Sequence, residues 1–253
     1  MKKLLLLGQD YPLFGSYHVA GLTPKLIGAI SAGADKSSPS MANKGDEDEP
    51  NEDAVLIVSD GSNCLLAVAD GHFGCGASHT ILDALSDACE SIPRKMGELR
   101  LLLSGLAGLR WGDPSGSTLI AAVLNQETRS CFGVSWGDSL LMTVGPSGCR
   151  VRSASDDRYI RRGSEFLAEE AFEFRLDEGD VVTVCTDGIF ECHYGSPLTS
   201  LRPQMLQEIW KKSCRSDEPD LKELASAMVI AALQGVNGFP GGQDNIGLIL
   251  ATA

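Results

Sequence analysis

The sequence predicts an α+β sandwich, and two observations about the order of its elements indicate this fold class. Strand-like runs follow one another between about residues 117 and 151 instead of alternating singly with helices. Helix-like segments come in pairs, at 76–91, 96–109, 203–213 and 221–233. A doubly wound parallel sheet needs repeated β-α-β units, whereas strands and helices grouped in separate blocks favour an α+β sandwich.

The composition is that of a chain that can bury one large core. Its 253 residues are 43% hydrophobic and only 6% aromatic, so we expect a mainly aliphatic core in a single domain over residues 1–253. The formal net charge of −13 argues against a nucleic-acid partner, because a phosphate backbone attracts a basic surface. The same excess of acid argues against binding to an anionic membrane.

The first fifty residues are expected to form an extension, a strand and a loop. Residues 1–23 form an extension, and we interpret the four leucines after Lys3 as a short strand or packing segment. Gly8 ends this apolar run too early for a secretory signal. A strand is expected at 27–32. The stretch 37–50, which is rich in Ser, Pro, Gly and acids, is expected to be a flexible loop.

The helices and cysteines follow from apolar patterning. In the segment 76–91, Ile81, Leu82 and Leu85 recur at the spacing of one helical face. The eight cysteines of the chain show no C-x-x-C spacing, and several lie in strand-like or helix-like runs, so we expect them to be small buried hydrophobic residues. This use of cysteine favours a reducing, cytoplasmic location over a disulfide framework.

Carboxylates stand at the ends of several apolar runs. Asp70 and Asp187 each follow such a run, whereas Asp53 and Asp244 precede one. A lone acid at a strand end is usually a turn or cap residue. Glycine directly after Asp70 and after Asp187, however, lets the backbone turn sharply and offer a carbonyl to a metal. Converging buried carboxylates would repel one another unless a cation neutralised them, and oxygen donors suit Mg²⁺ or Mn²⁺ rather than Zn²⁺.

Short motifs around these acids occur in an order that resembles a known family. They are Asn51-Glu52-Asp53-Ala54, Ala69-Asp70-Gly71-His72-Phe73-Gly74, Asp113 through Ser117-Thr118, Trp136-Gly137-Asp138-Ser139, Thr186-Asp187-Gly188-Ile189-Phe190-Glu191 and Gln243-Asp244-Asn245-Ile246. Together they resemble the metal-dependent protein phosphatases (the PPM, or type 2C, serine/threonine phosphatases), in a bacterial-type single-domain form. The match extends from about Ile27 to Leu250.

The resemblance implies a fold, an activity and a partner. The implied fold is a four-layer α-β-β-α sandwich in which two central antiparallel sheets are flanked by helices, with the metals at one end. The implied activity is hydrolysis of phosphoserine and phosphothreonine in proteins by a metal-activated water. The implied partner is a phosphoprotein substrate, and we expect the enzyme to be a monomer in the cytoplasm.

The resemblance also assigns residues to two Mn²⁺ or Mg²⁺ ions and to a weaker third ion. Asp70 would bridge the first two ions, Asp187 and Asp244 would complete the first site, and the Gly71 carbonyl would serve the second. Either Glu52 or Asp53 would join Gly71 there, one directly and the other through water. The third ion would be held by Asp113 with Asp187.

The remaining matched residues receive supporting roles. By resemblance His72 is the general acid that protonates the leaving oxygen; the alternative is a structural histidine bonded to a neighbouring acid. Asn245 and Glu191 would orient ligands or bound water. For Asp138 we expect a role in shaping a turn, with its side chain bonded to backbone amides.

Two departures from the family leave the substrate open. Asp48 occupies the place of an arginine that grips the substrate phosphate in relatives, and the stretch between Asp138 and Asp187 is short. The phosphate-binding residue is therefore unknown; the candidates are Lys44, Arg158, Arg161 and Arg162. Two alternatives to a protein phosphatase follow: a phosphomonoesterase for small esters, and a catalytically weak regulatory or binding member of the same family.

Overall fold

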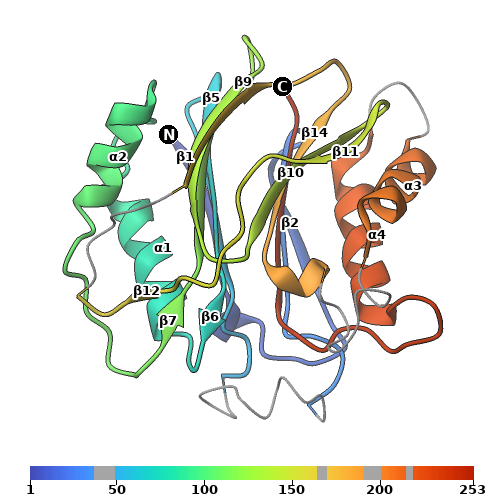
Figure 1. Cartoon of the computed structure of the whole chain (residues 1–253), viewed down its shortest axis with the longest axis horizontal. Helices are drawn as coiled ribbons and strands as arrows, with labels where there is room; N and C mark the ends of the chain where they lie inside the picture. Colours follow the sequence, from blue (N-terminus) through green and yellow to red (C-terminus); the bar gives the residue numbers. More distant parts are fainter. Residues whose placement is uncertain (37–48, 164–169, 191–200, 215–218) are drawn as a thin grey trace.

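The computed structural model describes residues 1–36, 49–163, 170–190, 201–214 and 219–253. Its centre consists of two six-stranded sheets in which every strand pairs antiparallel with its neighbours. The sheets stand face to face, with one pair of helices on each outer side (Figure 1). The predicted four-layer α-β-β-α sandwich is confirmed.

The first sheet has the strand order β1-β4-β5-β8-β9-β13. Its members are β1 (Lys2–Leu7), β4 (Ala54–Ser59), β5 (Asn63–Ala69), β8 (Leu119–Asn125), β9 (Ser130–Trp136) and β13 (Glu170–Arg175). The second sheet has the order β11-β10-β14-β15-β3-β2. Its members are β11 (Gly148–Val151), β10 (Leu140–Gly145), β14 (Val181–Cys185), β15 (Ile246–Ala251), β3 (Leu26–Ser31) and β2 (His18–Thr23).

The helices cover the outer faces of the two sheets. Helices α1 (Gly76–Ala88) and α2 (Met96–Ser104) pack with the first sheet, and α3 (Pro203–Ser213) and α4 (Leu221–Gln234) pack with the second. All four were predicted from apolar spacing. Helix α2 ends at Ser104, five residues before the predicted end, because the helical hydrogen bonds stop at Gly105, which is its C-cap.

Three apolar clusters lie between these layers, and the central one holds the two sheets together. It contains Val55, Ile57, Leu66 and Ile249 and is almost entirely aliphatic, as the composition predicted. Because helices cover the outer faces, the inner strands β4 and β5 are buried along their whole length. Such strands appear as continuous apolar runs, which leaves the acids at their ends conspicuous in the sequence.

The N-terminal extension is part of both sheets. Strand β1 pairs with β4, as the strand interpretation of the leucines predicted, and β2 pairs with β3. Between them, the short 3₁₀ helix η1 (Gly8–Asp10) lies against α1. Its Gly8 amide donates to Nε2 of His79 (3.1 Å). Residues 37–48 of the predicted acidic loop lie outside the described residues.

A third, very small sheet lies beside the end of the sandwich. It consists of β6 (Gly71–His72), β7 (Gly116–Ser117) and β12 (Ile160–Arg161), in the order β12-β7-β6. These two-residue strands carry no periodic signal, so the sequence did not indicate them. Within the described part of the chain, no helix is both long and apolar enough to cross a membrane. Cys89, Cys131 and Cys185 are buried, as predicted.

Candidate metal centre

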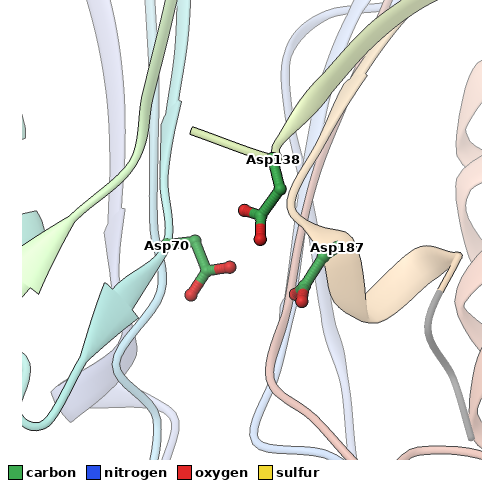
Figure 2. A group of neighbouring side chains, drawn as sticks. All are labelled: Asp70, Asp138 and Asp187. Atoms are coloured by element: carbon green, nitrogen blue, oxygen red, sulfur yellow. The ribbon is translucent and has the colours of Figure 1, made fainter. Parts of the chain in front are cut away.

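Three carboxylates meet at one end of the sandwich, where the two sheets come together. Asp70 follows β5 of the first sheet, and Asp187 follows β14 of the second, at the start of the 3₁₀ helix η3 (Asp187–Ile189). Asp138 lies in the turn that carries the chain from β9 to β10, from one sheet to the other. One oxygen from each of the three lies within 4.8 Å of the others, and the carboxylates point toward one another (Figure 2). We call these three residues the acidic cluster.

The acidic cluster is electrostatically costly without a cation. Asp70 and Asp187 are only 3% and 7% exposed. Burial, followed by the charges of the surrounding carboxylates, raises the pKa of Asp187 well above its ordinary value. Burial also raises the pKa of Asp138, against a smaller opposing effect of His72. Negative charge held this closely is unfavourable for every member of the cluster.

The donor atoms of the acidic cluster fit a hard divalent cation. The Oδ1 atoms of Asp138 and Asp187 are buried and have no hydrogen-bond partner among the described residues. Buried polar atoms rarely lack a hydrogen-bond partner unless a ligand, an ion or a water molecule contacts them. Since all the donors are carboxylate oxygens, Mg²⁺ and Mn²⁺ suit them better than Zn²⁺ does.

Asp244 lies close to the cluster without forming part of it. Its negative charge contributes to the raised pKa values of both Asp138 and Asp187. It is 6% exposed, and its Oδ1 accepts a hydrogen bond from the backbone amide of Asn245 (2.8 Å). Asp244 is therefore placed to add a carboxylate to a larger site around the cluster.

Glu52 and Asp53 make different contacts in the structure. A Cβ atom added to Gly71 would lie 2.5 Å from the backbone oxygen of Glu52, so these two residues are in close contact. The Oδ2 atom of Asp53 instead accepts a hydrogen bond from the Thr186 hydroxyl (2.7 Å), which joins the two sheets. Glu52 is thus the acid beside Gly71, and Asp53 has a structural bond.

Asn245 connects backbone segments rather than binding the carboxylate of Asp244 through its side chain. Its Oδ1 accepts a hydrogen bond from the Glu52 amide (2.9 Å), and its Nδ2 donates to the carbonyls of Ala32 (3.2 Å) and Pro50 (3.0 Å). It therefore fixes the position of Glu52. Glu191, the other residue expected to orient a ligand, lies outside the described residues.

Asp113 lies at the N-terminus of α1 and not in the acidic cluster. Its Oδ2 accepts from the Gly76 amide (3.0 Å), and its Oδ1 accepts from the Ser115 amide (3.1 Å). The Ser115 hydroxyl in turn accepts from the Ala77 amide (2.9 Å). These bonds satisfy donors that a helix start leaves open, and a carboxylate is also favoured there by the helix dipole.

His72 borders the acidic cluster. Its Nδ1 lies 3.5 Å from Oδ1 of Asp70, and its ring packs against that of Tyr159, with ring centroids 4.4 Å apart. The contact with Asp70 is the one expected of a structural histidine, and it also places an imidazole where a proton could be passed to a leaving group. Burial, followed by the negative charge of the acidic cluster, raises the pKa of Tyr159 to about 12, so its phenol is neutral.

Sequence reasoning did not place Asp138 in the acidic cluster and gave no role to Tyr159. The turn before β10 is held by Asp156, whose Oδ1 accepts from the Gly137 amide (3.2 Å) and whose own amide donates to the Gly137 carbonyl (2.9 Å). The Asp138 carboxylate is thereby left facing Asp70. The signal for Asp138 was its place in the motif Trp136-Gly137-Asp138-Ser139, whereas Tyr159 had no signal in the sequence.

Comparison with solved structures identifies the fold as that of the PPM-type serine/threonine phosphatases. The serine/threonine phosphatase PstP/Ppp of Mycobacterium tuberculosis matches with a TM-score of 0.61 and 18% identity, covering 93% of this chain and 98% of that one. The PPM Ser-Thr phosphatase MsPP of Mycobacterium smegmatis, in complex with cacodylate, matches with a TM-score of 0.56 and 19% identity, covering 94% and 97%. RsbX in complex with magnesium matches with a TM-score of 0.53 and 14% identity, covering 93% and 98%.

The sequence itself has no such match. No protein-family model and no curated protein matches it. The likeness to PPM-type phosphatases therefore extends over the fold of nearly the whole chain, at an identity below 20% in each of the three structures.

Proposed function

We propose that this protein is a metal-dependent phosphatase that hydrolyses phosphoserine and phosphothreonine esters in proteins. The observation that carries the proposal is the acidic cluster, in which buried carboxylates from both sheets converge on one point. A fold with no metal to bind would lose stability by gathering these charges. The likeness to phosphatases of the PPM type, one of them in complex with magnesium, supports the same chemistry.

Two Mg²⁺ or Mn²⁺ ions are proposed, held by residues around the acidic cluster. Asp70, Asp138 and Asp187 would be the principal ligands, with Asp244 adjacent to them. The Gly71 carbonyl and Glu52 would provide further donors, since these two residues are in contact with each other and Gly71 directly follows Asp70. When bound, such ions lower the pKa of a water molecule and orient it for in-line attack on phosphorus.

The residues of this chain then contribute binding and proton transfer. Attack of water on phosphorus breaks the bond between phosphorus and the seryl or threonyl oxygen, and that oxygen needs a proton. His72 lies at the edge of the cluster with one face covered by Tyr159, so its imidazole can donate that proton. The contact with Asp70 holds the ring in position.

Metal-dependent turnover tests the proposal. Purified protein is treated with EDTA, dialysed, and assayed with Mn²⁺ or Mg²⁺ on a phosphoserine peptide, a phosphothreonine peptide and p-nitrophenyl phosphate. We expect no activity in EDTA and recovery on both peptides when metal is added. Recovery on p-nitrophenyl phosphate alone would indicate a phosphomonoesterase for small esters. Absence of turnover with metal bound would refute the proposed phosphatase activity. The protein would then be a regulatory or binding protein with the same fold.

A further inference from the structure

Phe73 lies at the edge of the proposed active site with most of its ring in solvent. It follows His72, the last residue of β6, and precedes the start of α1. It is 59% exposed, more than any other Phe, Tyr or Trp among the described residues. Single exposed apolar side chains are common on protein surfaces, so exposure alone assigns no role to this ring.

The backbone of Phe73 adds a second observation. Its φ angle is +64°, in the left-handed region that a bulky side chain rarely adopts. Glycine would adopt this conformation without a steric cost, whereas phenylalanine pays it. Because the ring is exposed, little packing energy offsets that cost within the folded chain. Unfavourable backbone of this kind is found preferentially at functional sites.

Packing on both sides of Phe73 fixes this conformation. A Cβ atom added to Gly71 would lie 2.5 Å from the backbone oxygen of Glu52, and one added to Gly74 would lie 2.5 Å from Oδ2 of Asp113. The backbone on either side of Phe73 is therefore in close contact with other segments and cannot shift to relieve position 73. The ring is held facing outward by the structure around it.

The proposed reaction brings the substrate chain to this ring. For His72 to donate a proton, the leaving oxygen has to come within about 3 Å of the imidazole. That oxygen belongs to a serine or threonine side chain, so the peptide backbone passes close to His72. Consecutive Cα atoms are about 3.8 Å apart, both in the peptide and between His72 and Phe73. A residue beside the phosphorylated one is thus within reach of Phe73.

We infer that Phe73 contacts the residue next to the phosphoserine or phosphothreonine and selects substrates with an apolar side chain there. This inference rests on the proposed function and names the class of phosphoprotein segment that the site takes. An apolar side chain would cover the Phe73 ring and remove apolar surface of both partners from water. Binding would then offset the backbone cost that folding does not.

The test uses two peptides that differ only beside the phosphorylated residue. Both carry a non-hydrolysable phosphonate analogue of phosphoserine, flanked on both sides by leucine in one peptide and by asparagine, of similar size, in the other. Their Kd values are measured by calorimetry in Mg²⁺ for the wild type, Phe73→Ala, Phe73→Gly and Leu101→Ala. The last variant is the matched control, because Leu101 is 73% exposed on α2, far from β6 (Figure 1). Thermal unfolding midpoints show whether the variants are folded.

We expect the wild type to bind the leucine peptide about fivefold more tightly than the asparagine peptide, because leucine buries apolar surface against the ring. Leu101→Ala should keep this ratio, whereas Phe73→Ala and Phe73→Gly should bring it close to one. The two Phe73 variants should differ in stability. Phe73→Gly relieves the unfavourable φ, so its unfolding midpoint should lie about 2–4 °C above that of Phe73→Ala.

Three results would overturn the inference: a Kd ratio near one in the wild type, an unchanged ratio in Phe73→Ala, or no binding of either peptide. The phosphatase proposal is decided separately, by metal-dependent turnover of the phosphoserine peptide. A Kd ratio that depends on Phe73 in a protein without turnover would support the peptide contact and refute the proposed activity.

Discussion

At the scale of single residues, replacing Asp138 by asparagine separates a metal-binding role from a turn role. The turn is held by Asp156, so we expect Asp138→Asn to fold normally. Loss of a cluster carboxylate should weaken Mn²⁺ binding at least about tenfold, since even changes among the outer neighbours of a metal ligand cost that much. In EDTA the variant should be more stable than the wild type, because one repelling charge has been removed.

Calorimetric titration with Mn²⁺ and thermal unfolding in EDTA would measure both effects. Asp83→Asn, which removes an exposed acid from α1, is the matched control and should leave both quantities unchanged. Wild-type Mn²⁺ affinity in Asp138→Asn would show that this carboxylate is no ligand.

His72 gives a second prediction at this scale. Removal of a general acid slows the hydrolysis of a substrate more when its leaving group has a greater need for a proton. His72→Ala should therefore slow phosphoserine peptide hydrolysis far more than hydrolysis of p-nitrophenyl phosphate, whose leaving group is stable as an anion. The measurement is the ratio of kcat values on the two substrates, and an equal loss on both would leave His72 with only its structural contact to Asp70.

The residues of the site were partly visible in the sequence. Asp70 and Asp187 were indicated because each ends a buried strand and is followed by glycine. Asp138 was expected to shape a turn; in the structure it does lie in the turn between β9 and β10, but its carboxylate also belongs to the acidic cluster, and the Gly137 amide is bound by Asp156, eighteen positions further along the chain. Contacts of this kind depend on how distant segments meet, which local patterning does not encode.

At the scale of elements, His79 connects the N-terminal segment to helix α1 and makes stability depend on pH. Its Nδ1 lies 3.3 Å from Oε1 of Gln9, and its Nε2 lies 3.1 Å from the Gly8 amide and 3.2 Å from the Asp53 carbonyl, so the ring links α1 to the N-terminal segment. Burial lowers the pKa of His79 below its ordinary value of 6.5. The unfolded chain therefore binds this proton more readily, and stability falls as the pH drops below about 6.5.

Urea unfolding of wild type and His79→Gln at pH 7.5 and pH 5.5 would test this linkage. The wild type should lose more free energy of unfolding than the variant on acidification, by at most about 1.4 kcal/mol per pH unit for one proton. An identical loss in both proteins would mean that protonation of His79 does not contribute to the pH dependence of stability.

Elements with strong periodicity were predicted well, and those defined by pairing alone were not. The four helices follow from apolar spacing along the chain. Strand β2 and the three two-residue strands of the small sheet have no such pattern, because their existence depends on a neighbouring strand in the right register. The small sheet could therefore be found only from the structure.

At the scale of the whole molecule, the acidic cluster joins the two halves of the sandwich. Asp70 comes from the first sheet, Asp187 from the second, and Asp138 from the connection between them. A cation bound here would hold both sheets at one end, in addition to the apolar cluster between them. Monomeric state, cytoplasmic location and the exclusion of nucleic acid and membrane partners remain predictions from composition and resemblance.

The measurement that tests the central claim most directly is calorimetric titration of the EDTA-treated wild type and Asp187→Asn with Mn²⁺. We predict saturable binding to the wild type, a rise in its unfolding temperature with Mn²⁺, and loss of both effects in Asp187→Asn, because burial and the neighbouring carboxylates make the charge of Asp187 unfavourable without a cation. Absence of Mn²⁺ binding to the wild type, or the same isotherm for both proteins, would contradict the account.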